Sequence, residues 1–375
     1  MKRSATTIVL VTILFYSSCF AQNPNQNIDK LAHQYMTKND ATCIAIGYVD
    51  HGQAKFYSCG TLSKTSAIPA DSNTLFEAGS VTKVFTAISV AKAVNEKKGL
   101  SYTDRLSQWL PAQVHAPDYY GQQITILNLL NHSAALPSVP GNLDSTEIPF
   151  DLMNPYLHYT RKELYAFLNR YRLTEKPGSK YDYSNLGMGL AGDILCRYRA
   201  DTYEHIIRKD ILMPFGMNRT FIAVTESDKG NFAQPNTAAG KPVQNWDFDV
   251  MAPAGAIKSC SLDLTRFITH NMYLGKEPDS LLKKAMLDCQ RTTIHAGKNL
   301  EVGLGWHISP MDNDTLIWHN GGTGGYRSFI GFNKTYKTAI VVLANTDEMV
   351  DDLAIKILHE LDKRQESFPN PNLVH

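Results

Sequence analysis

The sequence lacks the features that mark several large functional classes. Its 375 residues carry 37 Lys and Arg against 36 Asp and Glu, a formal charge of +1, and no run of five like charges occurs. Without a basic stripe, no nucleic-acid partner is expected. Beyond the N-terminal segment, no apolar stretch approaches the roughly 20 residues that a membrane-spanning helix requires. We therefore expect a protein without a stable membrane span whose partners are small or neutral.

Motifs for cofactor binding are equally scarce. No Cys-x-x-Cys pair and no His-Glu-x-x-His segment is present, so zinc binding has no support. No glycine-rich segment ends in Gly-Lys-Ser or Gly-Lys-Thr, which argues against a phosphate-binding loop. Residues 187–192 formally match a dinucleotide fingerprint, but no strand precedes them, and close helix packing explains these glycines better. Neither a metal nor an organic cofactor is expected.

Residues 1–21 are typical of an export signal. Two basic residues precede an apolar stretch, residues 8–16, and a small-residue cleavage site that ends at Ala21. We predict cleavage after Ala21 and a periplasmic or secreted protein. The alternative is a lipid anchor on Cys19, but Tyr16 occupies the position where lipoprotein signals usually carry Leu.

Cysteines are few, and cleavage after Ala21 would leave an odd number, so at least one thiol has no partner within the chain. Cys43 and Cys59 lie symmetrically about residues 50–52. A three-residue turn there would place them opposite each other on adjacent strands. This predicts a possible disulfide, and the alternative is two small, buried apolar side chains.

The sequence does contain enough apolar residues, 43%, for a globular core. Apolar spacing predicts helices over residues 28–36, 81–94 and 350–361, and strands over 43–49, 53–59, 316–318, 326–332 and 339–344. In the first hairpin, Ile44, Ile46 and Phe56 are expected on one face. The helix over 81–94 is apolar almost all round, which predicts that it is buried.

This order of elements predicts an α+β fold, in which N- and C-terminal helices flank an antiparallel β-sheet with an inserted, mostly helical lobe. Residues 101–203 are expected to form helices joined by polar loops, including a long one over 137–160. We expect a single catalytic unit over residues 22–366. The predicted boundaries are a sheet lobe over about 27–78 and 250–363, a helical lobe over about 79–249, and a flexible tail over 367–375.

The sharpest chemical feature is Ser80 followed by Lys83 at the start of the apolar helix. A serine at a helix N-terminus lies beside unpaired N–H groups, which favour developing negative charge. Lys83 shares its helix face, and desolvation would lower the pKa of the ammonium toward that of a working base. The alternative is an ordinary serine cap followed by a surface lysine.

Tyr183 and Asn185, in the segment Tyr181–Gly187, form the second candidate element. A phenol beside an ammonium loses or relays a proton more easily, and an amide two residues further on can bond a substrate amide. The alternative is a tyrosine packed in a loop, one of 18 in the chain.

The third element is the glycine-rich segment 318–327, which contains His319, Gly321 and Gly322. Glycine on an edge strand lets a substrate backbone approach closely. The N–H groups of Gly322 and Ser80 are therefore candidates for an oxyanion hole. The alternative is a glycine-rich hairpin with an unengaged histidine. The absence of a Gly-x-Ser-x-Gly elbow disfavours an α/β-hydrolase.

These three elements, in this order, resemble the penicillin-recognising serine hydrolases, in particular the class C β-lactamase-like branch with its DD-peptidases and esterases. The resemblance spans about residues 76–345 and includes the segments 76–87, 126–137, 214–217 and 303–306. It implies a β-lactamase/transpeptidase-like fold. By resemblance, Ser80 is the nucleophile, Lys83 and Tyr183 the acid/base pair, Asn185 a substrate ligand, and His319 and Gly321 the third motif.

The third motif departs from the class C pattern, Lys-Thr-Gly. Asn320 lacks the hydroxyl that helps hold a substrate carboxylate in that family, and Thr323 or Arg327 is a candidate replacement. Ala135, where family members often carry Gly, is a second departure. His319-Asn320-Gly321 looks more like the peptidases and esterases of the branch.

We therefore expect a serine acyl-hydrolase that cleaves an amide, lactam or ester through a Ser80 acyl-enzyme without a cofactor. The resemblance implies a DD-peptidase/carboxypeptidase-like or β-lactamase-like activity on a small-molecule or peptide substrate: a β-lactam, a D-alanyl peptide or an ester. The alternatives are an esterase of the same family and a catalytically silent binding protein on the same fold.

Overall fold

The computed structural model describes residues 24–145, 149–275, 277–311 and 314–367. The predicted signal segment lies outside these residues, as do residues 368–375 of the predicted tail. Within the described ranges, no helix combines the length and the apolar character that crossing a membrane requires.

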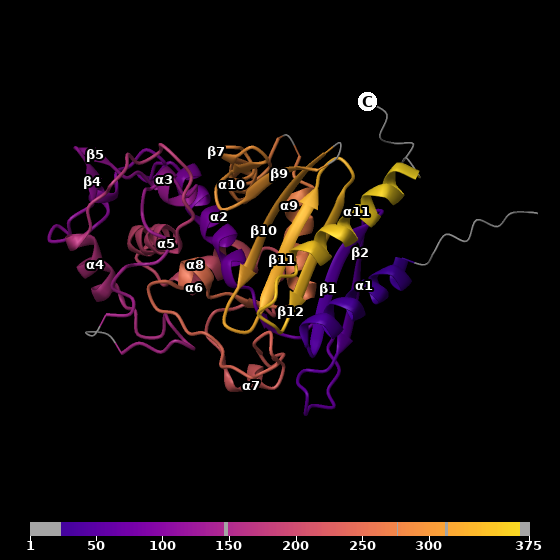
Figure 1. The fold of residues 1–375 in the computed structure, drawn as a ribbon. Coiled ribbons are helices and arrows are strands. Elements are labelled where there is room, and N and C mark those ends of the chain that lie inside the picture. Colours follow the sequence, from indigo (N-terminus) through magenta and orange to yellow (C-terminus); the bar gives the residue numbers. More distant parts are fainter. Residues whose placement is uncertain (1–23, 146–148, 276, 312–313, 368–375) are drawn as a thin grey trace, which may run out of the picture.

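An eight-stranded antiparallel sheet dominates one side of the molecule (Figure 1), with the strand order β2-β1-β12-β11-β10-β9-β8-β7. Its strands are β1 (Cys43–Asp50), β2 (Gln53–Gly60), β7 (Ile294–Gly297), β8 (Leu300–Val302), β9 (His307–Met311), β10 (Asp314–Gly322), β11 (Arg327–Asn333) and β12 (Thr338–Ala344). The first hairpin of the chain pairs with its last strand, β12. Strands from both ends of the chain therefore lie side by side in one sheet, which confirms the predicted α+β class.

Helices cover both faces of this sheet. α1 (Pro24–Asn39) and α11 (Asp351–Ser367) lie on one face, and α9 (Ser261–Met272) lies on the other (Figure 1). In β12, alternate side chains enter the two cores: Val342 belongs to the core under α1 and α11, and Val341 to the core that contains α9. Because both faces are covered, β12 is apolar from Ala339 to Ala344 instead of alternating with polar residues.

The remaining elements form a mostly helical part beside the sheet (Figure 1). They are β3 (Phe76–Glu77), which pairs with β6 (Lys258–Ser259), the hairpin β4 (Asp118–Tyr119) and β5 (Gln122–Gln123), and the helices α2 (Thr82–Asn95), α3 (Ile126–Leu130), α4 (Arg161–Arg170), α5 (Asn185–Arg199), α6 (Tyr203–Ile207), α7 (Glu226–Lys229), α8 (Ala252–Gly255) and α10 (Leu281–Cys289). As predicted, α2 is buried, and Phe85 stacks on Phe267 of α9 with ring centroids 4.1 Å apart. This packing joins the helical part to the sheet.

The first hairpin corrects two predictions. Its turn has two residues, His51 and Gly52 at φ +50° and +75°, instead of three. Positive φ at both central positions is the geometry of a tight hairpin turn. The shorter turn moves the register by one residue, and such a slip sends side chains to the opposite face of the sheet.

The predicted Cys43–Cys59 disulfide is therefore wrong. Cys43 pairs with Gly60 and Cys59 with Ile44, and both thiols are free. Phe56 lies opposite Gly47 and not opposite Ile46, so its side chain is on the other face from Ile44 and Ile46.

Several elements were missed. The sequence patterns gave no indication of α9, α10 or the three short strands β7, β8 and β9, and the two terminal helices extend further than predicted. Strands of three to five residues give too few alternations to be recognised from periodicity.

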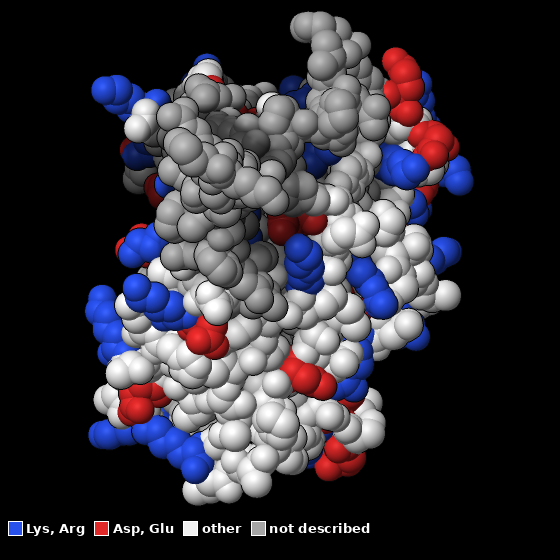
Figure 2. All heavy atoms as spheres, turned by 90° about the vertical axis from the view of Figure 1, so that its right-hand side faces the viewer, with Lys and Arg blue, Asp and Glu red and all other residues white. Residues whose placement is uncertain are grey.

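On the side of the molecule seen in Figure 2, the basic and acidic side chains of described residues are interspersed. This distribution agrees with the nearly neutral formal charge of +1.

Candidate functional site

Ser80 lies at the junction between β3 and α2. Gly79 has φ +51°, and residues Gly79–Val81 form a single 3-10 turn that leads into α2. No side chain of the described residues caps the 3-10 turn or the helix that follows it. The serine is therefore not an ordinary helix cap, and its hydroxyl is available to other partners.

Lys83 is completely buried, with no exposed surface. Its Nζ lies 2.9 Å from Ser80 Oγ and donates to the carbonyl of Ala254 at 2.7 Å. Burial lowers the pKa of this lysine well below its ordinary value, because the ammonium loses its hydration. The free amine then has a lone pair within hydrogen-bond distance of the serine hydroxyl. The alternative of a surface lysine is wrong.

Tyr183 approaches the same oxygen from another element. Its hydroxyl donates to Ser80 Oγ at 2.7 Å, and Lys83 Nζ lies 4.9 Å from the centroid of its ring. Burial raises the pKa of the phenol above its ordinary value, and the bond to Ser80 opposes this rise only in part. The expectation that the neighbouring lysine makes Tyr183 more acidic is thus wrong for the resting site, because the buried lysine is itself easily deprotonated. Tyr183 is a neutral proton donor.

The loop after α3 supports Tyr183. The carbonyl of His132 accepts the Asp182 N–H at 2.7 Å, and His132 Nδ1 accepts the Ser184 N–H at 3.1 Å. The His132 ring also lies 4.6 Å from the Tyr183 ring. In the same loop, Ala135 has φ +54°, a left-handed conformation that glycine adopts without strain. This conformation explains why glycine would be preferred at the position.

The end of β10 packs directly against the serine. A Cβ on Gly321 would lie 2.1 Å from the Ala78 carbonyl oxygen and 2.9 Å from the Ser80 nitrogen, closer than any side chain can pack. A Cβ on Gly79 would lie 2.6 Å from the nitrogen of Gly322. These glycines let the two backbones approach, which brings the Ser80 and Gly322 segments together as an oxyanion hole requires.

Replacing Gly321 with alanine should push β10 away from Ser80 and lower kcat by ~10²-fold, the usual effect of losing one oxyanion-hole donor. The measurement is steady-state kinetics on any substrate that the wild type cleaves. Gly297→Ala is the matched control in the same sheet, because no heavy atom lies within 4 Å of a Cβ there. Equal activity of both variants would contradict the close approach.

His319 is buried and neutral. Its Nδ1 donates to the carbonyl of Asn320 at 2.5 Å, so Nε2 carries a lone pair, which has no partner among the described atoms. Burial, with help from the nearby His307 and Lys83, lowers the pKa of His319 well below its ordinary value. The third motif therefore provides a neutral acceptor where class C enzymes carry a lysine.

Of the predicted site residues, Ser80, Tyr183, Gly321 and Gly322 line the surface pocket, whereas the buried Lys83 and His319 do not. It is lined by Ser80, Tyr183, Trp246, His307, Trp318, Asn320, Gly321, Gly322, Thr323, Arg327 and Met349. Sequence reasoning gave no role to Trp246, His307 or Met349, which are far from the three elements in the chain. Asn185 does not line this pocket; it begins α5, and its side chain lies beside the Tyr156 hydroxyl.

His307 had one signal in the sequence, because it directly follows the family-like segment 303–306. Its ring stacks on His319 at 4.9 Å, and its Nε2 lies 3.1 Å from the Tyr181 hydroxyl. Burial lowers the pKa of His307 to about 4, so this imidazole is also neutral at physiological pH.

Among the described residues that line the pocket, Arg327 is the one charged side chain. Its Nη1 donates to the carbonyls of Thr323 at 2.9 Å and Tyr326 at 3.1 Å, and none of the described carboxylates forms an ion pair with it. Asp351 instead accepts a hydrogen bond from Asn320 at 2.6 Å. Of the two candidates for binding a carboxylate, Arg327 is the cation, whereas the Thr323 hydroxyl is buried.

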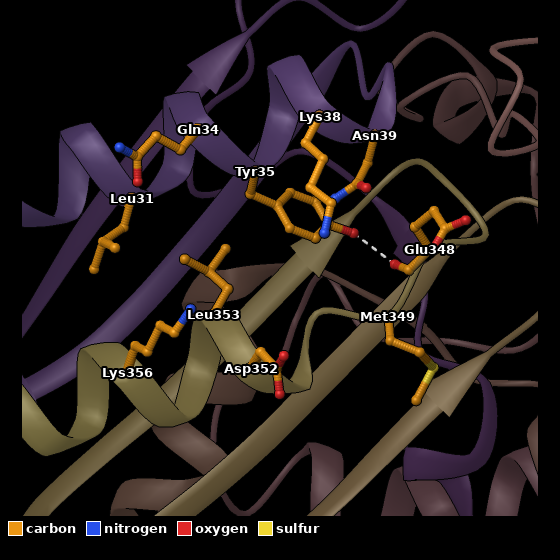
Figure 3. Close-up of a pocket in the computed structure, with 10 residues that line it drawn as sticks. All are labelled: Leu31, Gln34, Tyr35, Lys38, Asn39, Glu348, Met349, Asp352, Leu353 and Lys356. Carbon is orange, nitrogen blue, oxygen red and sulfur yellow. Dashed lines mark hydrogen bonds between the residues drawn. The ribbon is translucent and has the colours of Figure 1, made fainter.

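A second cavity lies between α1 and α11. α1 supplies one wall, and α11 with the loop before it supplies the other (Figure 3). Tyr35, the hydroxyl-bearing residue there, donates to the Glu348 carbonyl at 2.5 Å, and burial raises the pKa of its phenol. The cavity shares Met349 with the pocket around Ser80 but has no activated nucleophile.

Comparisons with known proteins agree with this geometry. A family model described as Beta-lactamase matches residues 28–363. A beta-lactamase of Pseudomonas fluorescens is 27% identical over 358 residues, which cover 87% of this chain and 94% of that protein. The D-alanyl-D-alanine-carboxypeptidase/endopeptidase AmpH of Escherichia coli (strain K12) is 24% identical over 353 residues and covers 88% of both chains.

Solved structures show the same fold. A beta-lactamase/D-alanine carboxypeptidase from Pseudomonas syringae superimposes with a TM-score of 0.76 at 23% identity, covering 93% of this chain and 99% of that one. A class C beta-lactamase superimposes with a TM-score of 0.77 at 23% identity, covering 93% and 97%.

Proposed function

Because the chain belongs to the beta-lactamase family and is a serine hydrolase, we propose that Ser80 forms a covalent acyl-enzyme with an amide, lactam or ester substrate. One observation carries the assignment: Ser80 Oγ lies 2.9 Å from the nitrogen of a fully buried lysine and 2.7 Å from a phenol. A nucleophile, a base and a proton donor thus meet at one oxygen in the pocket.

In acylation, Ser80 Oγ attacks the substrate carbonyl carbon while its proton passes to the free amine of Lys83. The N–H groups of Ser80 and Gly322 stabilise the oxyanion that forms. When the tetrahedral intermediate collapses, the bond to the leaving group breaks. The departing nitrogen or oxygen takes a proton from Tyr183, which is replenished from Lys83.

Deacylation reverses these roles. A water molecule gives a proton to the Lys83/Tyr183 pair and attacks the acyl carbon, and Ser80 Oγ leaves with a proton returned from the pair. Every proton is accounted for by these residues and water.

Arg327 favours substrates that carry a carboxylate. The guanidinium of Arg327 has no ion-pair partner among the described residues, and two hydrogen bonds from its Nη1 hold it against its own turn. A guanidinium held in this way matches the geometry of a carboxylate. This feature supports a DD-carboxypeptidase-like or β-lactamase-like activity over the hydrolysis of uncharged esters. Homologous beta-lactamases are typically exported, which supports our proposal of a periplasmic or secreted enzyme.

The decisive test of activity compares the purified protein on a D-Ala-D-Ala peptide, a chromogenic cephalosporin and a short nitrophenyl ester. Cleavage of the carboxylated substrates is expected. Cleavage of the ester alone would favour the esterase alternative. No turnover and no adduct with a penicillin or a fluorophosphonate would favour a silent binding protein.

Arg327→Gln is expected to lower the preference for a carboxylate. The ratio of kcat/KM for a D-Ala-D-Ala peptide over its C-terminal amide should fall ~10-fold or more, the usual effect of losing a hydrogen bond to a charged group. Arg327→Lys keeps the charge and should give an intermediate ratio. The exposed Arg291, changed to Gln, is the control. An equal loss on both substrates would contradict the role.

A further inference from the structure

Two buried ionisable side chains, Glu77 and Lys258, hold the backbone of one residue at the edge of the pocket. They face each other in the β3–β6 pair, and each is 2% exposed. Glu77 Oε1 accepts the N–H of Trp246 at 2.7 Å, and Lys258 Nζ donates to the carbonyl of Trp246 at 3.1 Å. The backbone of Trp246 is thus fixed at both its donor and its acceptor.

Trp246 forms an aromatic wall of the pocket. Its ring lies 5.8 Å from the ring of Tyr156 and 6.1 Å from that of Phe248, and these two stack on each other at 5.1 Å. A Cβ on Gly324 would lie 2.8 Å from the indole nitrogen, so the nitrogen-bearing edge of the indole packs closely against the chain just after β10. Glu77 and Lys258 therefore fix the backbone that carries an aromatic side chain of the pocket that contains the nucleophile.

Stability alone does not explain these charges. Burial raises the pKa of Glu77 to about 7, against the opposing effects of Lys258, Thr323 and the Trp246 N–H, and Asp247 adds to the rise. Burial also lowers the pKa of Lys258. Buried charges carry a desolvation cost that well-packed apolar residues avoid. What the two residues achieve here is the placement of Trp246. Glu77 itself lies three residues before the nucleophile in the sequence.

We propose that Glu77 and Lys258 are positioning residues that hold Trp246 as the binding wall for an aromatic or other flat apolar group on the acyl part of the substrate. This inference rests on the proposed function. Arg327 is assigned to the carboxylate of the portion of the substrate that leaves during acylation. We therefore assign the aromatic wall to the acyl portion, which stays bound to Ser80. Trp246 is thus a specificity residue.

The test compares two D-Ala-D-Ala peptides that differ only in a phenylacetyl or an acetyl group on the acyl side. Trp246→Ala and Glu77→Leu should each lower the preference for the phenylacetyl peptide by ~10-fold, mostly through KM, as expected when an apolar contact is lost. Glu77→Gln keeps an oxygen acceptor and should retain most of the preference.

The double variant Glu77→Leu/Trp246→Ala should lose no more preference than Trp246→Ala alone, because the two residues act as one unit. Additive losses would overturn the proposal, as would a Glu77→Leu variant that slows both peptides equally. Asp210→Asn, which disrupts a buried ion pair with Lys92 outside the pocket, is the control for a general loss of stability.

A binding measurement separates this proposal from the catalytic one. Calorimetry with the Ser80→Ala variant should show tighter binding of the phenylacetyl peptide than of the acetyl peptide. Adding Glu77→Leu should remove the difference. If this pattern holds although the wild type forms no adduct on Ser80, the acyl-enzyme assignment fails and the Trp246 wall stands. If the wild type is acylated but the two peptides bind equally, the wall is wrong.

Discussion

Ser80→Ala is expected to abolish acylation and to lower kcat by ~10³-fold or more, because removing the nucleophile of a serine hydrolase leaves only the contribution of binding and the oxyanion hole. The hydroxyl lies between Lys83 and Tyr183, and no other described serine in the pocket replaces it. Mass spectrometry after incubation with a penicillin or a fluorophosphonate should show one adduct on the wild type and none on the variant.

The matched control for this variant is Ser89→Ala. Ser89 belongs to the same helix, α2, and its buried hydroxyl has no hydrogen-bond partner within the described part of the chain, so its removal should affect neither labelling nor turnover. Full activity of Ser80→Ala on all three substrate types would show that the nucleophile is assigned wrongly.

Lys83→Met is expected to lower kcat by ~10²- to 10⁴-fold, the range for the loss of a general base. Methionine keeps a similar length and volume without a titratable group. The wild-type pH profile of kcat/KM should show the titration of Lys83, and the residual activity of the variant should not. His307 cannot supply this titration near neutral pH, because burial lowers its pKa to about 4.

The same variant should be more stable than the wild type, by ~1 kcal/mol or more at neutral pH. The native pKa of Lys83 is lowered, so the unfolded state binds the additional proton and the wild type loses stability at every pH below the unfolded pKa, about 10.4. The gain should therefore be largest at low pH and shrink as the pH rises toward 10. Thermal unfolding at pH 6, 8 and 10 measures it, and a gain that does not depend on pH would contradict a buried, deprotonated lysine.

The buried Lys83 is thus expected to increase the rate of catalysis and to lower the free energy of unfolding. Lys83 is completely buried, and the imidazoles of His307 and His319 near it are neutral. Burial, and not a neighbouring cation, keeps the amine of Lys83 deprotonated and ready to accept a proton. Such an arrangement is typical of active sites, which retain groups that a purely structural core would replace.

The sequence by itself determined the elements that depend on local spacing. Ser80 and Lys83 are three residues apart on one helix, so their contact follows from helical geometry. The apolar repeat of α2 predicted its burial, and the strands and helices at the two ends of the chain predicted the α+β class, which the fold confirms. The roles of the site residues stay predictions.

Only the tertiary structure decided the features that depend on contacts between distant segments or on a single residue of register. Tyr183 reaches Ser80 across 103 residues of chain, and the Trp246 wall is fixed from β3 and β6, with no periodic signal in the sequence. One residue fewer in the first turn removed the predicted disulfide. The raised pKa of the Tyr183 phenol also follows from burial. Desolvation depends on everything that packs around a group in space and not on its neighbours in the chain.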